Sequence, residues 1–384
     1  MEPGQDCDAI VNRTRARIIE MIGGEAAAIF VREPFIDPRC PQTSDADVLA
    51  FGDVDSLLPV RLNLPATPGT LPIDVIWLPR ALLADSQRFA AEGLLPHRLV
   101  TSALLQDRNG EAEAAHRRVR VAIEQPQARA ARIAGFMQMG FLAVREIGVT
   151  WDFPAMALFW LHTAFAAATA ALCDAAGQLC PNVYTRPFDN LRSLPEPLRE
   201  NWDARITGAL RLNVDPESLI PVLRELHGTI ARRFPEPSWP AAIRGTTRAE
   251  YVYFLDPAEL EWRISVAREM AARGDAVQAA YYLRFWAYSL ARVPMVHQCA
   301  QQGRDVSFMR PERAMAPALQ ELCVDIIDPL SAILAAATLT ADDVRDALAV
   351  VTALRVHAVD VAAGRGLMPG ALQPWIPFEK GGDP

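Results

Sequence analysis

Three aspartates stand in a pattern that suits binding of a divalent cation. Asp45 and Asp47 are two residues apart, and Asp74 lies within a strongly apolar segment. Residues two apart on a β-strand point to the same face, so Asp45 and Asp47 would share one face while Ala46 and Val48 point into a core. Carboxylates this close repel each other unless a cation lies between them. Mg²⁺ binds one or two carboxylates and takes its other ligands from substrate phosphates and water.

The three carboxylates converge if the two segments form neighbouring strands. That arrangement suits a nucleotidyl transfer assisted by two metal ions, in which the ions neutralise developing charge on the phosphates. Each segment also has a simpler explanation, because Asp-x-Asp is common in solvated turns and an aspartate in an apolar strand can lie at a sheet edge. The two segments together, in this order, favour the catalytic interpretation.

Short strands in the first part of the chain must position these aspartates. A helix is predicted over 8–22, and strands are predicted over 26–31, 47–51, 59–64, 72–78 and 99–105. From residue 111 onward, Ala, Leu and Arg at helical spacing predict helices. We therefore predict an α+β fold with a small mixed-sheet domain over 1–110, a larger all-helical domain over 111–364 and a loosely ordered tail over 365–384.

The composition excludes several kinds of chemistry. Of the 38 basic residues in this 384-residue chain, only Lys380 is a lysine. A phosphate-binding P-loop, a protein-kinase lysine and a pyridoxal-phosphate Schiff base are therefore excluded from the folded body. The net charge of -8 argues against a nucleic-acid partner, because duplex binding needs a basic face.

The cysteines and one apolar stretch bear on the compartment. The six cysteines are irregularly spaced and form no C-x-x-C, which is typical of a reduced protein. Residues 153–173 contain no Asp, Glu, Lys or Arg and are long enough to cross a bilayer. Their alanine content, His162 and the lack of flanking basic clusters favour a buried helix instead. We expect a cytoplasmic protein without a membrane partner.

The first part of the chain resembles a nucleotidyltransferase domain of the polymerase-beta type. More narrowly, it is similar to aminoglycoside nucleotidyltransferases, which carry a helical C-terminal domain. The resemblance extends over residues 8–110 and reaches the helical part through one short segment. The matching pieces are the helix and strand before residue 31, then 44–47, 72–75 and 99–110, with the short segment at 182–191.

The resemblance implies transfer of a nucleoside monophosphate from an NTP to a hydroxyl of a small molecule. Asp45 and Asp47 would hold Mg²⁺ and the triphosphate, with Ser44 beside the nucleotide. Asp74 would complete a site for two Mg²⁺ ions and take the proton from the acceptor hydroxyl, which attacks the α-phosphate and releases pyrophosphate. Antibiotic inactivation and natural-product tailoring both fit this chemistry.

One motif of the family is missing. The family carries Gly-Ser after its first strand, and these residues grip the β- and γ-phosphates. This chain has no glycine between Gly24 and Gly52. Arg32, and Arg39 on the following loop, could supply charge to a triphosphate instead. A catalytically altered nucleotide-binding protein is therefore one alternative function.

The helical part offers candidates for the acceptor side. Tyr281, Arg284 and Tyr288 share one helix face, which predicts either a core helix or a wall of the acceptor cleft. Arg186 is a further acceptor-side candidate. The remaining alternative function is a toxin-type transferase acting on RNA or protein, which would need a basic groove beside Asp45. The sequence leaves open whether the protein forms a homodimer.

Overall fold

We describe the protein from a computed structural model. The structure describes residues 7–32, 45–53, 60–64, 66–149, 154–180, 182–199, 201–243, 245–303, 324–335 and 338–367. Arg39, Ser44 and most of the predicted tail fall outside the described residues, so their predicted properties stay predictions.

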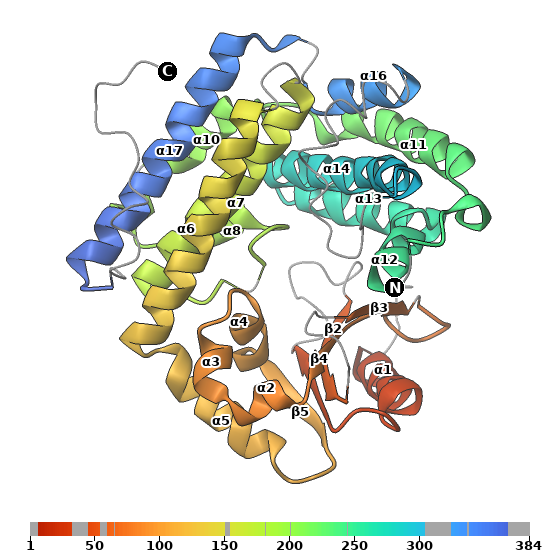
Figure 1. Cartoon of the computed structure of the whole chain (residues 1–384), viewed down its shortest axis with the longest axis vertical. Helices are drawn as coiled ribbons and strands as arrows, with labels where there is room; N and C mark the ends of the chain where they lie inside the picture. Colours follow the sequence, from red (N-terminus) through yellow and green to blue (C-terminus); the bar gives the residue numbers. More distant parts are fainter. Residues whose placement is uncertain are drawn as a thin grey trace. The chain divides into compact units, whose positions relative to one another are not determined.

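A five-stranded mixed sheet is built from the first part of the chain (Figure 1). Its strands are β1 (Ala28–Arg32), β2 (Ala46–Gly52), β3 (Val60–Leu64), β4 (Ile73–Pro79) and β5 (Ser102–Asp107). They lie in the order β3-β4-β2-β1-β5. β2 and β4 are parallel, and the other neighbours are antiparallel. The predicted α+β class is confirmed.

Helices make up most of the other described residues. Among the described residues up to 123, the helices are α1 (Cys7–Ile22), α2 (Ala81–Ala84), α3 (Ser86–Ala90), α4 (Leu95–Val100) and α5 (Ala112–Ile123). The strand predicted over 99–105 begins only at Ser102, because the preceding residues form α4, whose first turn accepts Pro96.

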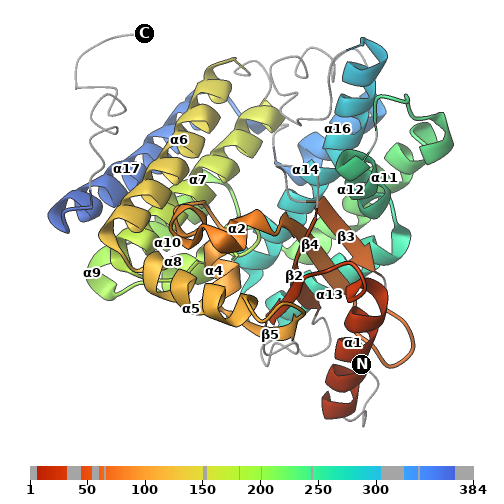
Figure 2. The ribbon, with the colours of Figure 1, turned by 60° about the horizontal axis from the view of Figure 1, so that its bottom comes forward.

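The two faces of the sheet are covered by different helices. Ala46 and Val48 belong to one apolar core cluster with Ile18 of α1, and Figure 2 shows α1 beside the sheet. On the other face, the ring of Phe51 packs against that of Phe89 in α3, with 6.1 Å between the ring centroids. Alternation along β2 therefore sends its even-numbered residues to the α1 layer and its odd-numbered residues to the opposite layer.

The chain divides into two compact units, each assembled from separate stretches. Unit 1 comprises 1–89, 98–120 and 214–334, and unit 2 comprises 90–97, 121–213 and 335–384. The predicted boundary at residue 110 does not coincide with these units. The difference arises because helices from the second half of the chain pack with the sheet-bearing segment, as α12 (Gly245–Phe254) does against β3.

The later helices of unit 1 form a layered bundle. They are α11 (Pro216–Arg233), the 3-10 helix η2 (Glu236–Ser238), α12, α13 (Pro257–Ala272), α14 (Ala276–Gln301) and α16 (Val324–Ile333). α14 packs against α11, α13 and α16, and it is buried along most of its length. It is the central helix of this bundle.

Unit 2 is helical among its described residues. Its helices are α6 (Pro126–Val149), α7 (Pro154–Ala176), α8 (Pro187–Arg192), α9 (Glu196–Arg199), α10 (Trp202–Ala209) and α17 (Ala341–Gly364). α7 and α17 are long and apolar enough to cross a membrane by length and composition, with 89% and 33% of their apolar windows buried. α6 and α17 pack on α7, so the predicted buried helix is confirmed.

A buried ion pair anchors the end of α7 within unit 2. Arg132 donates to Asp174, with 2.6 Å between Nη2 and Oδ1. The same guanidinium donates to the carbonyl oxygens of Ala90 and Ile123, and His97 lies 3.3 Å from the second oxygen of Asp174. The charges are therefore hydrogen-bonded on several sides, as buried charges must be.

Candidate active site

The strand pairing aligns a row of polar residues across all five strands. Asp47 of β2 lies directly beside Asp74 of β4, and Asn63 of β3 pairs with Asp74 on its other side. Arg32 of β1 donates from Nη1 to Oδ2 of Asp47 over 3.4 Å, and it pairs in register with Ser102 of β5. Two of the predicted site residues are thus neighbours on parallel strands.

The predicted orientation of the aspartates is confirmed for Asp47. Ala46 and Val48, its neighbours in β2, are buried in the α1 core, so Asp47 points to the opposite face. Asp45 directly precedes β2. Asp74 is 7% exposed, in a strand otherwise lined by apolar residues.

Asp47 lies between two guanidinium groups. Arg32 approaches Oδ2 at 3.4 Å, and Arg98 of α4 approaches Oδ1 at 3.9 Å. The three side chains keep exposed fractions of 27%, 23% and 23% for Arg32, Arg98 and Asp47. This cluster is therefore partly exposed to solvent.

Asp45 shares an electrostatic environment with the other two aspartates. The pKa of Asp45 is raised to about 7, first by burial and then by the negative charges of Asp47, Asp74 and Glu259, while Arg263 acts in the opposite direction. The shift reports mainly the burial of this carboxyl group, with repulsion by the neighbouring acids as a further contribution. The structure therefore brings the three predicted aspartates into one region.

The chemistry of these side chains fits Mg²⁺. No group of three or more His, Cys, Asp or Glu side chains among the described residues forms a metal-binding cluster. Asp47 and Asp74 supply two hard carboxylate groups side by side, and Mg²⁺ commonly takes only one or two carboxylates plus phosphate oxygens and water. A cation there would also relieve the repulsion by Asp47 and Asp74 that, after burial, contributes to the raised pKa of Asp45.

A pocket of about 470 Å³ opens beside Asp45 and Asp74. One wall comes from the sheet and the segment before β4, through Leu62, Leu64, Pro72 and Ile73. The other wall comes from η2, α12, α13 and the residues between them, through Glu236, Arg248, Val252, Tyr253, Asp256, Glu259 and Trp262. The volume is in the usual range for small-molecule sites.

Negative charge and aromatic rings dominate the polar part of this pocket. Its lining contains five carboxylates and one arginine, namely Asp45, Asp74, Glu236, Asp256, Glu259 and Arg248. Arg248 pairs with Glu236 at 2.9 Å, and Asp256 caps α13 by accepting from the N–H of Ala258. The lining therefore keeps a net negative charge after these contacts.

Arg263 of α13 lies behind this wall among aromatic rings. It pairs with Glu259 at 2.5 Å and donates to the hydroxyl of Tyr282 at 2.7 Å. Its guanidinium carbon lies 4.3 Å from the ring centre of Trp262 and 5.0 Å from that of Trp286. These contacts hold Glu259 in place at the pocket and bring a positive charge near Asp45.

The predicted acceptor-side residues of α14 lie in the interior of the bundle. Tyr281, Arg284 and Tyr288 are 1%, 1% and 4% exposed. Arg284 donates to the carbonyl oxygen of Ile333 at 2.9 Å. None of the three lines the pocket beside Asp45, so of the two interpretations of this helix, the core helix is the one that the structure shows.

Three further predicted candidates are Arg186, Arg39 and Ser44. Arg186 belongs to unit 2, where its guanidinium lies 3.8 Å from Asp189. Arg39 and Ser44 are outside the described residues. Their predicted roles stay predictions.

Sequence reasoning missed three charged residues of this region, Arg98, Glu259 and Arg263. Asp256 followed by Pro257 is a helix-start signal, and Glu259 and Arg263 are four apart, so a shared helix face was predictable. No local pattern could indicate that this face places Glu259 in the lining of the pocket beside Asp45.

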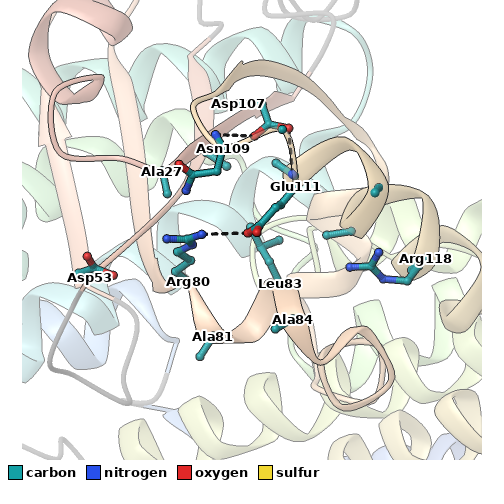
Figure 3. Close-up of a pocket in the computed structure, with 15 residues that line it drawn as sticks. Ala27, Asp53, Arg80, Ala81, Leu83, Ala84, Asp107, Asn109, Glu111 and Arg118 are labelled. Carbon is teal, nitrogen blue, oxygen red and sulfur yellow. Dashed lines mark hydrogen bonds and ion pairs between the residues drawn. The ribbon is translucent and has the colours of Figure 1, made fainter.

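A second pocket, of about 690 Å³, lies beyond the carboxyl ends of β2 and β4 (Figure 3). Asp53 and Arg80 line it, and Figure 3 shows Arg80 directed toward Glu111, at 2.9 Å. Asp107 accepts from the N–H of Ala112 at 2.9 Å and so caps α5. Charged groups at this end are thus engaged in pairing and capping.

Comparisons with known proteins leave the family open. No family model matches the chain, and no curated protein matches it significantly. Among solved structures, a nucleotidyltransferase-like protein from Exiguobacterium sibiricum 255-15 is similar at a TM-score of 0.30 and 11% identity, over 82% of this chain and 88% of that chain. This likeness is distant.

Proposed function

We propose that the protein transfers a nucleoside monophosphate from an NTP to a hydroxyl group of a small, cationic molecule. The observation that carries the proposal is the placement of Asp47 and Asp74 side by side on parallel strands, next to Asp45 and a pocket of small-molecule size. When bound by these carboxylates, Mg²⁺ would supply neutralisation of the triphosphate charge.

The chain's own residues supply the remaining steps. Arg32 offers a guanidinium to phosphate oxygens at the edge of the aspartate group. Asp74 is buried and lines the pocket, so it is placed to accept the proton of the acceptor hydroxyl. The hydroxyl oxygen then forms a bond to the α-phosphorus, the bond to the β-phosphate oxygen breaks, and pyrophosphate leaves.

The pocket lining supports a cationic acceptor. Ammonium groups are attracted by the net negative lining and by the rings of Tyr253 and Trp262. The same lining argues against the toxin-type alternative, because that function would need a basic groove for RNA beside Asp45. Antibiotic inactivation and natural-product tailoring are both reactions of this class.

A pyrophosphate-release screen tests the proposal. The four NTPs would each be combined with a panel of hydroxylated amines and Mg²⁺, using the wild type, Asp47→Asn and, as a matched control at the other end of the sheet, Asp53→Asn. We expect release that needs both an acceptor and Mg²⁺, that is lost in Asp47→Asn and that persists in Asp53→Asn.

If the screen detects no pyrophosphate release, calorimetry with NTP and Mg²⁺ measures whether the protein binds the nucleotide at all. Binding without release from any combination would contradict the enzymatic proposal and identify a nucleotide-binding protein. Absence of both binding and release would show that the function of the protein does not involve an NTP.

A further inference from the structure

We infer that the acceptor carries an apolar group, and that Leu62, Leu64 and Val252 bind this group in the pocket beside Asp45. The inference rests on the proposed function and specifies the acceptor further, as an amphiphilic hydroxylated amine. Hereafter these three residues are called the apolar patch.

The apolar patch is formed where α12 packs against the edge of the sheet. β3 is the outermost strand beside β4, and α12 contacts it, as Figure 1 shows. Leu62 and Leu64 belong to β3 and Val252 belongs to α12, and all three line the pocket of about 470 Å³. Two elements far apart in the chain thus direct bulky apolar side chains to one pocket.

The side chains of the apolar patch keep surface that the fold leaves uncovered. Val252 is 42% exposed, as one of six exposed large apolar side chains among the described residues. Of those six, Val252 alone lines either of the two pockets described above. Leu62 and Leu64 pack against the α1 core but are only partly buried. A ligand group that covers this surface removes it from water, which favours binding.

The larger pocket at the other end of the sheet has no such patch. Its apolar side chains are Leu83, which is 7% exposed, and seven alanines, namely Ala27, Ala28, Ala81, Ala84, Ala112, Ala114 and Ala115. A single exposed apolar residue is ordinary at a protein surface. Three bulky ones in the lining of one pocket, with polar groups around them, are typical of a ligand site.

Aromatic rings connect the apolar patch with the carboxylates of the same pocket. Tyr253 follows Val252 in α12, and it lines the pocket together with Trp262 and Glu259. The Tyr253 hydroxyl donates to Glu259, and its ring packs edge to face on Trp286 with 5.9 Å between the ring centroids. These contacts hold the ring between the two parts of the lining.

The lining therefore matches a ligand with two different ends. An ammonium group suits the carboxylates, and an apolar ring or chain suits the apolar patch. A molecule that carries hydroxyl groups on every side would place some of them against Leu62, Leu64 and Val252, whose side chains offer no hydrogen-bond partner. Burying such hydroxyl groups costs free energy.

Ligand-observed NMR titration of the full chain with two amines tests the inference without an NTP. The probes are 2-amino-1-phenylethanol and glucosamine. Each carries an ammonium group, at least one hydroxyl group and a six-membered ring, and the ring is apolar in the first and hydroxylated in the second.

The variants are Val252→Ser, which removes apolar surface, and Val252→Ile, which keeps it. Val121→Ser is the matched control, because Val121 is a valine of α5 that is 67% exposed and lines neither pocket. Thermal melting shows that each variant is folded.

We expect the wild type to bind 2-amino-1-phenylethanol roughly 10-fold more tightly than glucosamine, because only the phenyl ring covers the apolar patch. Val252→Ser should weaken binding of the phenyl compound about 3-fold and leave glucosamine binding unchanged. Val252→Ile and Val121→Ser should bind both amines like the wild type. Equal affinity of the wild type for the two amines, or an equal loss in Val252→Ser and Val121→Ser, would overturn the inference.

The results also separate this inference from the proposed function. Selective binding of the phenyl compound that depends on Val252, in a protein that releases no pyrophosphate from any NTP, would support the apolar patch and contradict the transferase. Transfer to both amines with the same KM, unchanged in Val252→Ser, would support the transferase and overturn the role of the apolar patch.

Discussion

Both ends of the five-stranded sheet carry charged side chains, and the two ends use them differently. At the amino ends of β2 and β4, Asp47 and Asp74 lie side by side next to Asp45, whose pKa is raised to about 7. At the carboxyl ends, Arg80 pairs with Glu111 and Asp107 caps α5. The first end gathers three carboxylates in one region beside Arg32 and Arg98, and the second, hereafter called the matched end, engages its charges in an ion pair and a helix cap.

The difference shows that charge arrangement is a better guide to this site than pocket size. The pocket at the matched end is larger, at about 690 Å³ against about 470 Å³. Paired groups and helix caps stabilise the fold without a ligand. Gathered carboxylates cost stability until a cation joins them, so their presence indicates binding or catalysis.

The largest expected effect is on activity. Asp74→Asn removes one of the three carboxylates at the amino ends of β2 and β4. It should lower kcat on the order of 1,000-fold, which is the scale of losing a preorganised electrostatic contact. Asp107→Asn, at the matched end, should leave kcat within about 2-fold. Steady-state kinetics of both variants measures these effects. Equal losses of kcat in the two variants would contradict the proposed difference between the two ends of the sheet.

The next effect concerns stability and pH in the metal-free protein. The pKa of Asp45 is raised from 3.8 to about 7, first by burial and then by Asp47. The folded state therefore holds this proton more tightly than the unfolded state, so Asp45 adds stability at low pH that is lost as the pH rises through that range. Asp45→Asn should remove this loss.

Urea unfolding in EDTA from about pH 4 to about pH 8 measures the difference. Relative to Asp45→Asn, the wild type should lose at least ~1.4 kcal/mol of unfolding free energy, the equivalent of one pKa unit; this is below the full shift because the side chain is partly exposed. Asp53→Asn, at the matched end, should follow the wild type. A constant difference across the pH range would show that the folded protein does not raise the pKa of Asp45.

A smaller effect is expected from the helix cap. Asp107→Ala removes the carboxylate that accepts from the N–H groups at the start of α5, and it should cost about 1 kcal/mol of unfolding free energy. The KM for substrates should stay unchanged. A changed KM without a loss of stability would indicate that the larger pocket also binds substrate.

The smallest effect is expected for Arg80→Met. The Arg80–Glu111 pair is exposed to solvent on both sides, and such pairs add little stability because water and salt screen them. The urea midpoint should not shift measurably. A clear shift, coupled to Glu111→Gln in a double-mutant cycle, would show that the matched end is stabilised by this pair.

Local patterns were enough to predict the elements that carry the aspartates. Alternation of polar and apolar residues predicted that Asp47 lies opposite Ala46 and Val48, and the structure confirms it. The predicted bounds of the five strands and of the first helix agree with the structure to within a few residues. Only the last strand was displaced, where α4 occupies the first residues of the predicted segment.

The sequence by itself determined which side chains share a strand or helix face, because those relations depend on spacings of two to four residues. Tertiary structure alone decided which faces meet. It placed Glu259 at the pocket with Asp45, brought Arg98 to Asp47, and buried Arg284 in the core. These contacts are between residues far apart in the chain. Local sequence periodicity indicates which face of a strand or helix a residue occupies, but it does not indicate which distant face packs against it.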